Sequence, residues 1–157
     1  MIMKKVIVIL SALLLLSIAT FAQTGKSIYE KYSDIKGVEA VYISPAMFRF
    51  VGTLPNTNIK TSSIRNFKGF YILSFSSGSK DPNVVRLSED VRNMVRKGGY
   101  EKLMEAKEEG ETTEMYGVVN ADLCRSFVMI AKEEGETTFI CIDADIYLSD
   151  LQRMAQQ

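Results

Sequence analysis

Histidine is absent from this 157-residue sequence, and its absence excludes several chemistries. Without an imidazole there can be no Ser-His-Asp triad and no Cys-His pair. A zinc site would lose its usual nitrogen ligand and would have to rely on carboxylates and the two cysteines. We therefore expect no catalytic residue, no metal site and no cofactor, and we predict that the protein is not an enzyme.

An excess of one charge is also missing, because 19 lysines and arginines balance 19 aspartates and glutamates. Nucleic-acid binding requires clustered basic side chains that neutralise phosphates. An anionic membrane surface attracts the same kind of cluster. The balance of charge thus predicts a partner that is neither a nucleic acid nor a membrane surface.

A long apolar run is found only at the N-terminus. Two lysines precede Val6–Ala19, a run shorter than the roughly 20 residues of a membrane-spanning helix. Thr20–Ala22 then places small residues where a signal peptidase would cleave. This layout is typical of a cleaved secretory signal, with an uncleaved anchor helix as the alternative. We expect residues 1–22 to be removed and residues 23–157 to form one exported domain, periplasmic or extracellular and not lipidated.

Periodicity and turn residues predict alternating helices and strands over the next part of the chain. The expected elements are a helix within Ser27–Ile35, a strand at Val38–Ile43, a helix at Pro45–Val51, a strand at Gly69–Phe75 and a long helix from Pro82 to Gly98. Between them, Leu54–Asn66 is polar and is expected to be an open loop or to hold one helical turn. The arginines of the long helix are expected to form a solvated face, with an anion site as the alternative.

The octapeptide Ala-Lys-Glu-Glu-Gly-Glu-Thr-Thr occurs twice, at Ala106–Thr113 and at Ala131–Thr138. Each copy lies between two runs of β-forming residues, and its glycine can adopt the positive φ that a tight hairpin requires. A calcium loop is the alternative, but such loops gather several Asp or Asn oxygens at alternating positions. We predict that both copies are hairpin tips in a C-terminal four-stranded antiparallel meander.

Folding each copy about its Glu-Gly centre predicts a register in which apolar residues face apolar residues. The predicted pairs are Ala106–Thr113, Met104–Met115, Leu103–Tyr116, Lys107–Thr112, Val128–Cys141, Met129–Ile140, Ile130–Phe139 and Lys132–Thr137. In this register Cys124 lies four residues beyond the partner of Cys141, about 13 Å along the strand. Bridged cysteines need α-carbons within about 7 Å. We expect two buried free thiols rather than the disulfide that export would permit.

The whole pattern predicts a two-layer α+β domain with one mixed sheet of about six strands and helices packed mainly on one face. Crossovers around the first two strands are expected to be parallel and right-handed. A C-terminal helix is expected to carry Leu148, Leu151, Met154 and Ala155.

Three functional hypotheses follow from this fold. One layer of helices covers one face of a sheet, so the opposite face, with Phe127, Met129, Ile140 and Ile142, must be covered by terminal helices or by another molecule. The leading hypothesis is that it contacts a protein partner or a second copy. The alternative is a small-molecule or glycan pocket beside Leu54–Asn66, with Tyr42, Tyr71 or Phe75 as the stacking surface. The third is acid–base chemistry by Asp143 and Asp145, which alternate along a strand and would share a face.

Five stretches of the sequence together resemble a known family. They are Phe21–Gln23, Gly37–Phe48, Tyr100–Ala106, Ser126–Ile130 and Ile142–Leu151. They resemble a family of small exported Bacteroidetes proteins that is catalogued only as a domain of unknown function. The resemblance covers nearly all of residues 23–157. The resemblance implies a location in the cell envelope or periplasm and an α+β fold, and it supplies no catalytic residue.

Overall fold

The computed structural model describes residues 23–52 and 64–150. Its elements are α2 (Gly25–Tyr32), β1 (Val38–Ile43), α3 (Pro45–Gly52), β2 (Ile64–Ser76), α4 (Pro82–Lys97), β3 (Glu101–Glu108), β4 (Glu111–Asn120), β5 (Leu123–Glu133) and β6 (Glu136–Tyr147). This is the predicted order of helices and strands. The predicted signal peptide, residues 54–63 of the predicted loop and residues 151–157 of the predicted C-terminal helix lie outside the described residues.

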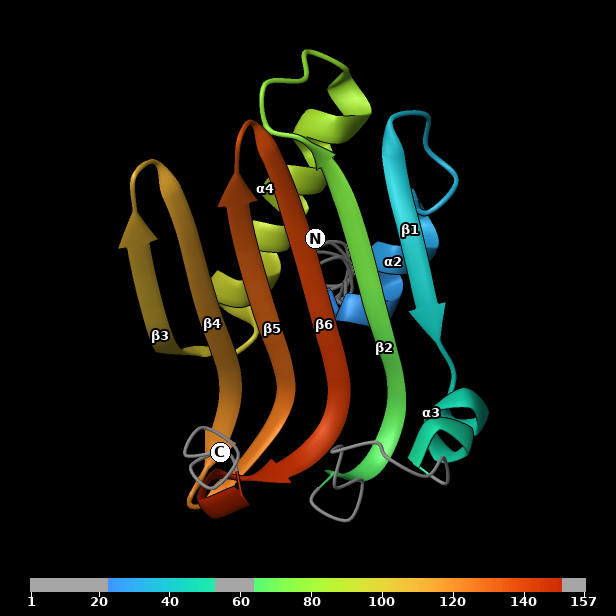
Figure 1. Cartoon of the computed structure of the whole chain (residues 1–157), viewed down its shortest axis with the longest axis vertical. Coiled ribbons are helices and arrows are strands. Elements are labelled where there is room, and N and C mark those ends of the chain that lie inside the picture. Colours follow the sequence, from blue (N-terminus) through green and yellow to red (C-terminus); the bar gives the residue numbers. More distant parts are fainter. Residues whose placement is uncertain (1–22, 53–63, 151–157) are drawn as a thin grey trace, which may run out of the picture.

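One six-stranded sheet, in the order β1-β2-β6-β5-β4-β3, forms the front layer of the molecule (Figure 1). The last four strands form the predicted antiparallel meander. The helices α2 and α4 lie behind the sheet, on one face (Figure 1). We call the face toward these helices the inner face and the opposite one the outer face. The α+β class, the single sheet and the one-sided helices are therefore confirmed.

The prediction of a mixed sheet with parallel crossovers is wrong, because every neighbouring pair of strands is antiparallel. The chain passes from β1 through α3 into its antiparallel neighbour β2. The long helix α4 then carries the chain from β2 to the far edge, past β6, β5 and β4. Strands β2 and β3 run in the same direction without being neighbours, so this connection also returns the chain along the length of the strands. Figure 1 shows α4 running behind the sheet, mainly along the strands.

The core lies between the inner face and the apolar stripes of α2 and α4. It contains Ile28, Tyr32, Tyr71, Leu73, Phe75, Val84, Leu87, Val91, Met94, Val128, Ile130, Phe139 and Cys141. Asp81 caps the start of α4 through its side chain, which accepts a hydrogen bond from the amide of Asn83, and Pro82 occupies the first turn. The buried residues of α4 are Val84, Leu87, Val91 and Met94, whose spacing of three and four residues places them on one face of the helix.

Both copies of the octapeptide form the predicted hairpin tips. Glu109 and Gly110 have φ of 40° and 90°, and Glu134 and Gly135 have φ of 45° and 83°. Two successive positive φ values define the turn whose twist matches that of the flanking strands. Seven of the eight predicted cross-strand pairs are present. The exception is Leu103, because a register shift there pairs Tyr116 with Lys102 instead.

Strand β2 begins at Ile64, so the prediction that Leu54–Asn66 is loop throughout is wrong for its last three residues. Ile64 and Arg65 pair with Ile146 and Asp145 of β6 across an irregular register. Backbone partners supplied by a distant strand extend β2 into a segment whose own composition favours a loop.

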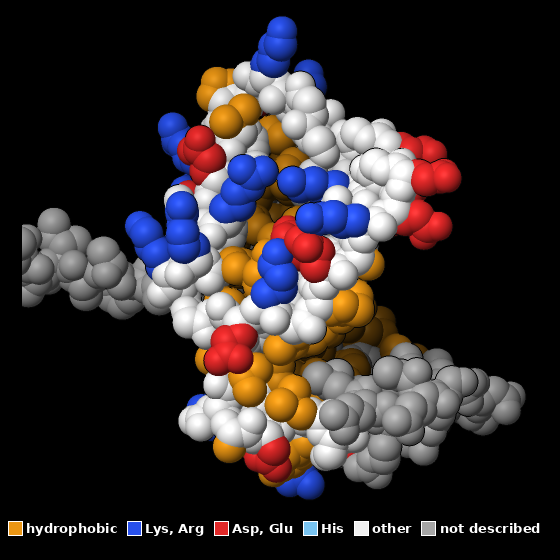
Figure 2. Space-filling view, turned by 90° about the vertical axis from the view of Figure 1, so that its left-hand side faces the viewer, with side chains coloured by type: hydrophobic (Ala, Val, Ile, Leu, Met, Phe, Trp, Pro, Cys, Tyr) orange, Lys and Arg blue, Asp and Glu red, His pale blue; other side chains and the backbone are white. Residues whose placement is uncertain are grey.

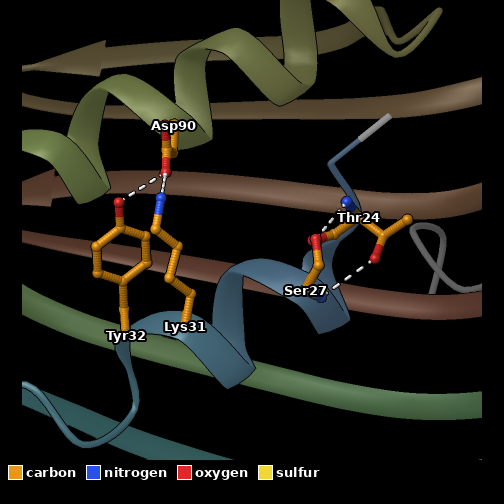
Figure 3. A network of polar contacts seen from close by, with 5 residues as sticks. All are labelled: Thr24, Ser27, Lys31, Tyr32 and Asp90. Atoms are coloured by element: carbon orange, nitrogen blue, oxygen red, sulfur yellow. Dashed lines mark hydrogen bonds and ion pairs between the residues drawn. The ribbon is translucent and has the colours of Figure 1, made fainter. Parts of the chain in front are cut away.

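Polar contacts cap the start of helix α2 and join its end to α4 (Figure 3). Thr24 and Ser27 form a reciprocal capping box at its start. Near its end, the Tyr32 hydroxyl donates to Asp90 Oδ2 over 2.6 Å, and Lys31 Nζ lies 2.7 Å from the same oxygen. Burial acts to raise the pKa of Asp90, but the hydrogen bonds from Lys31, Tyr32 and Gln23 outweigh burial and lower it.

The two cysteines are free and buried, as predicted. Burial raises the pKa of Cys141 to about 12 and also raises the pKa of Cys124. Both thiols therefore remain protonated at neutral pH and behave as small apolar side chains.

Candidate functional site

The outer face carries an apolar row that crosses every strand of the sheet. Directly paired residues share a face, so the register traces the row from one edge to the other. It runs Val41–Ile72–Ile140–Met129–Met115–Met104. A second row, Ile43–Phe70–Ile142–Phe127, runs beside it over four strands. The four residues predicted to form a contact face, Phe127, Met129, Ile140 and Ile142, thus lie together at the centre of a larger apolar surface.

These apolar side chains are only partly covered within the described part of the chain. Phe127, Met129, Ile140 and Ile142 are half-buried, whereas their inner-face neighbours Val128 and Phe139 are fully buried. At the two ends of the long row, Val41 is 50% exposed and Met104 is 46% exposed. Figure 1 shows α2 and α4 on the other side of the sheet. The outer face is therefore an extended apolar surface that the helical layer does not cover.

Acidic side chains border one side of this surface, next to the hairpin tips. A hollow there is lined by Met129, Ala131 and Thr138 together with Glu111, Glu133, Glu134 and Glu136. None of these four glutamates forms an ion pair with a described residue. No group of acidic or cysteine side chains in residues 23–52 and 64–150 is arranged to hold a metal ion. The outer face thus combines an apolar centre with an uncompensated negative border.

Two of the three predicted stacking residues lie together on the inner side of the sheet. The rings of Tyr42 and Tyr71 stack with centroids 5.2 Å apart, and Tyr29 of α2 lies 5.5 Å from Tyr71. They line a hollow with Lys26, Glu30, Lys68 and Asp143. Burial raises the pKa of Tyr71 to about 12, so its hydroxyl stays protonated at neutral pH. Phe75 is buried in the core and does not line this hollow.

The structure gives Asp143 and Asp145 different neighbours. Between them β6 contains an extra residue relative to β5, which interrupts the alternation that predicted a shared face. Asp143 lines the tyrosine hollow. Asp145 accepts a hydrogen bond from Asn66 over 2.6 Å and lies 3.6 Å from the Arg125 guanidinium. The two carboxylates therefore have different surroundings, and only Asp145 has polar partners among the contacts given above.

The arginines of α4, which the sequence predicted to form a solvated helix face, border a cleft. Arg92 and Arg96 of α4 line a hollow between that helix and the inner face of β4, β5 and β6. The spacing of arginines on a helix does not reveal this, because the cleft depends on where the helix crosses the sheet.

No described helix is both long and apolar enough to traverse a bilayer.

Comparison with known proteins gives one match. No curated protein and no solved structure matches the chain. A family model described as "Domain of unknown function (DUF4252)" matches residues 31–154, which include every strand of the sheet and both helices from α3 onward. The chain therefore belongs to the DUF4252 family of proteins, whose function is unknown.

Proposed function

We propose that this protein is an exported, non-catalytic domain that docks a protein partner on the outer face of its sheet. The observation that carries the proposal is the apolar row that extends across all six strands, on the face opposite the described helices α2 and α4. Monomeric soluble proteins rarely expose contiguous apolar surfaces larger than a few hundred square ångströms, and larger ones usually mark binding sites.

The acidic border selects the kind of partner. Four glutamates that form no ion pair with a described residue lie beside Met129 of the apolar row, near the hairpin tips. A partner that buries the row must bring its own side chains next to these carboxylates, where acidic groups are repelled and basic groups are attracted. The surface therefore fits a protein segment with an apolar centre flanked by lysine or arginine.

The chemistry of the chain supports a binding role. Histidine is absent, both thiols are buried, and the two candidate carboxylates have different surroundings. A general acid or base works best when its pKa is close to the operating pH. Burial moves the pKa values of Tyr71 and Cys141 to about 12, far above neutrality.

The direct test compares proteins crosslinked in the native envelope to the tagged chain and to a Met129→Glu variant. A true partner is captured by the parent protein and lost with Met129→Glu, and it is retained by Arg86→Glu, which places a new carboxylate on an exposed position of α4. The captured protein is then purified, and its affinity for the three chains is measured. Capture of the same proteins by all three chains would overturn the proposed docking face.

Export is tested separately by the N-terminal sequence of the protein isolated from cells. Cleavage after Ala22 predicts a chain that begins at Gln23. An intact residue 1 in the isolated protein would contradict cleavage and favour an anchored form.

A second candidate function is a small-molecule or glycan pocket at the stacked tyrosines. The specific observation is that Tyr42 is 47% exposed and stacks on Tyr71 above a hollow that contains charged groups of both signs. Sites for small ligands commonly combine aromatic walls with a few polar groups. A thermal-shift screen against sugars, repeated with Tyr42→Ala, distinguishes this function, because docking on the outer face does not depend on Tyr42.

A further inference from the structure

The inner side of the sheet contains a cleft where the helical layer ends before the sheet does. Strand β3 is exposed along its whole length, and β4 contributes only the partly buried Tyr116 to the core. Between α4 and the inner face of β4, β5 and β6 lies a hollow of about 370 Å³ that opens to solvent. Its apolar walls are Phe75, Val91, Val95, Tyr116, Ile130 and Phe139. Figure 2 shows this hollow from the β3 edge, with hydrophobic side chains in its depth and basic side chains around it.

The charges at the cleft are predominantly positive. Arg92 and Arg96 from α4 and Lys132 from β5 line it, and Glu114 is its one acidic lining residue among those described. The Glu114 carboxylate is already paired with Lys102, 2.8 Å away. In the described part of the chain, no carboxylate forms an ion pair with any of the three basic lining residues. The Arg96 guanidinium donates a hydrogen bond to the neutral Asn93 side chain.

We propose that this cleft binds a small amphipathic anion, with an apolar body and a single carboxylate or phosphate head. The body would displace water from the apolar walls, which is favourable in proportion to the apolar area covered. The head would lie between Arg92 and Lys132, and a guanidinium can donate two parallel hydrogen bonds to such a group. A volume of about 370 Å³ is near the lower end of ligand sites, which span roughly 300–1,000 Å³. It suits one short alkyl chain rather than a two-chain lipid.

This inference is independent of the docking role. The cleft and the outer row lie on opposite faces of the sheet, and no residue is shared between the cleft lining and that row. Failure of one proposal therefore leaves the other standing.

Calorimetry with octanoate, octanol and acetate separates the two halves of the proposal. Octanoate carries both the chain and the head, octanol carries the chain without the charge, and acetate carries the charge without the chain. We expect octanoate to bind at least about tenfold more tightly than either of the others, since a hydrogen bond to a charged group and several buried methylenes each contribute this much. Equal affinity for octanoate and octanol would overturn the role of the basic side chains.

Substitutions then locate the site. Arg92→Gln and Lys132→Gln should each weaken octanoate binding about tenfold, whereas Arg86→Gln, on the same helix but outside the cleft, should leave it unchanged. Arg86, Arg92 and Lys132 are all exposed or half-buried. The melting temperature of each variant shows whether it is folded. If Arg86→Gln weakens binding as much as Arg92→Gln, the ions bind the helix surface generally and the cleft is not the site.

A vesicle-binding experiment distinguishes a free ligand from a lipid headgroup. The protein is sedimented with phosphatidylcholine vesicles that contain about one-fifth phosphatidylglycerol, a fraction that gives an anionic surface. Binding of monomeric octanoate without vesicle binding supports the proposed free anion. Vesicle binding that Arg92→Gln abolishes, with no binding of octanoate, would overturn it in favour of a membrane surface.

Discussion

The two hairpins share the same octapeptide and the same turn, yet they occupy different environments. The β5–β6 hairpin lies in the middle of the sheet, and the β3–β4 hairpin forms one edge. On the inner face, the first pair outside the octapeptide is Ile130–Phe139 in β5–β6. At the same distance from the turn in β3–β4, the pair is Glu105–Glu114. The tip is identical, but the residues that flank it differ in polarity.

The edge hairpin contains a pair of like charges, Glu105–Glu114, where the central hairpin has an apolar pair. Two glutamates directly opposite each other repel, and Lys102 compensates by contacting both, at 2.9 Å from Glu105 and 2.8 Å from Glu114. These contacts raise the pKa of Lys102, first through Glu114 and then through Glu105. The comparison teaches that the octapeptide determines the turn alone, while its flanks determine whether the hairpin packs in the core or remains solvated.

The largest expected effect contrasts equivalent positions of the two hairpins. Phe139→Ala should lower the free energy of unfolding by about 3–5 kcal/mol, because it leaves a cavity in a fully buried site. Glu114→Ala should cost less than about 1 kcal/mol, because it removes one partly exposed ion pair. Urea denaturation measures both. Equal losses would mean that the edge hairpin is as tightly coupled to the core as the central one.

A smaller effect is expected where α2 contacts the central hairpin. A methyl group at Gly25 would lie 2.1 Å from Cys141 Sγ, so Gly25→Ala must displace the start of the helix. We expect a loss of about 1–3 kcal/mol. Gly78→Ala, in a turn with open space around the glycine, is the matched control and should change stability by less than about 1 kcal/mol. A neutral Gly25→Ala would show that α2 is not seated firmly on β6.

The link between α2 and α4 predicts a pH dependence. The pKa of Asp90 is lowered in the folded protein, so its contribution is present above the unfolded pKa and is lost as pH falls through the folded pKa. Asp90→Asn should cost about 1.5–3 kcal/mol at pH 7. At an acidic pH below both pKa values, the variant and the parent should be nearly equal in stability. Unfolding curves at the two pH values test this, and a pH-independent difference would contradict it.

The smallest effect concerns the tips themselves. Gly110 and Gly135 have φ of 90° and 83°, which an alanine adopts only with strain. Each Gly→Ala substitution should cost about 1 kcal/mol, and the two losses should be similar because the turns are the same. Chemical denaturation of the two variants side by side provides the comparison. A much larger loss for Gly135→Ala would show that the central tip depends on its surroundings as well as on its own geometry.

The features predictable from the sequence are local ones. The Glu-Gly centres fix the turns, the turns fix the register, and the register places Phe127, Met129, Ile140 and Ile142 on one face. The apolar spacing of α4 and its Asp81 cap define that helix. The cleft lined by Arg92 could not be predicted from local sequence patterns, because it depends on the position of α4 relative to β4 and β5.

The sequence by itself determined the order of elements, both hairpin turns, the buried stripe of α4 and the free state of the two buried cysteines, because each depends on residues close in the chain or on one hairpin register. Only the tertiary structure decided that β6 lies between β2 and β5, that the sheet is wholly antiparallel and that β2 extends back to Ile64. Pairing between distant strands depends on backbone hydrogen bonds and apolar burial that form cooperatively across the whole sheet. Several alternative pairings satisfy the same local pattern of apolar and polar residues, and only the packed molecule distinguishes among them.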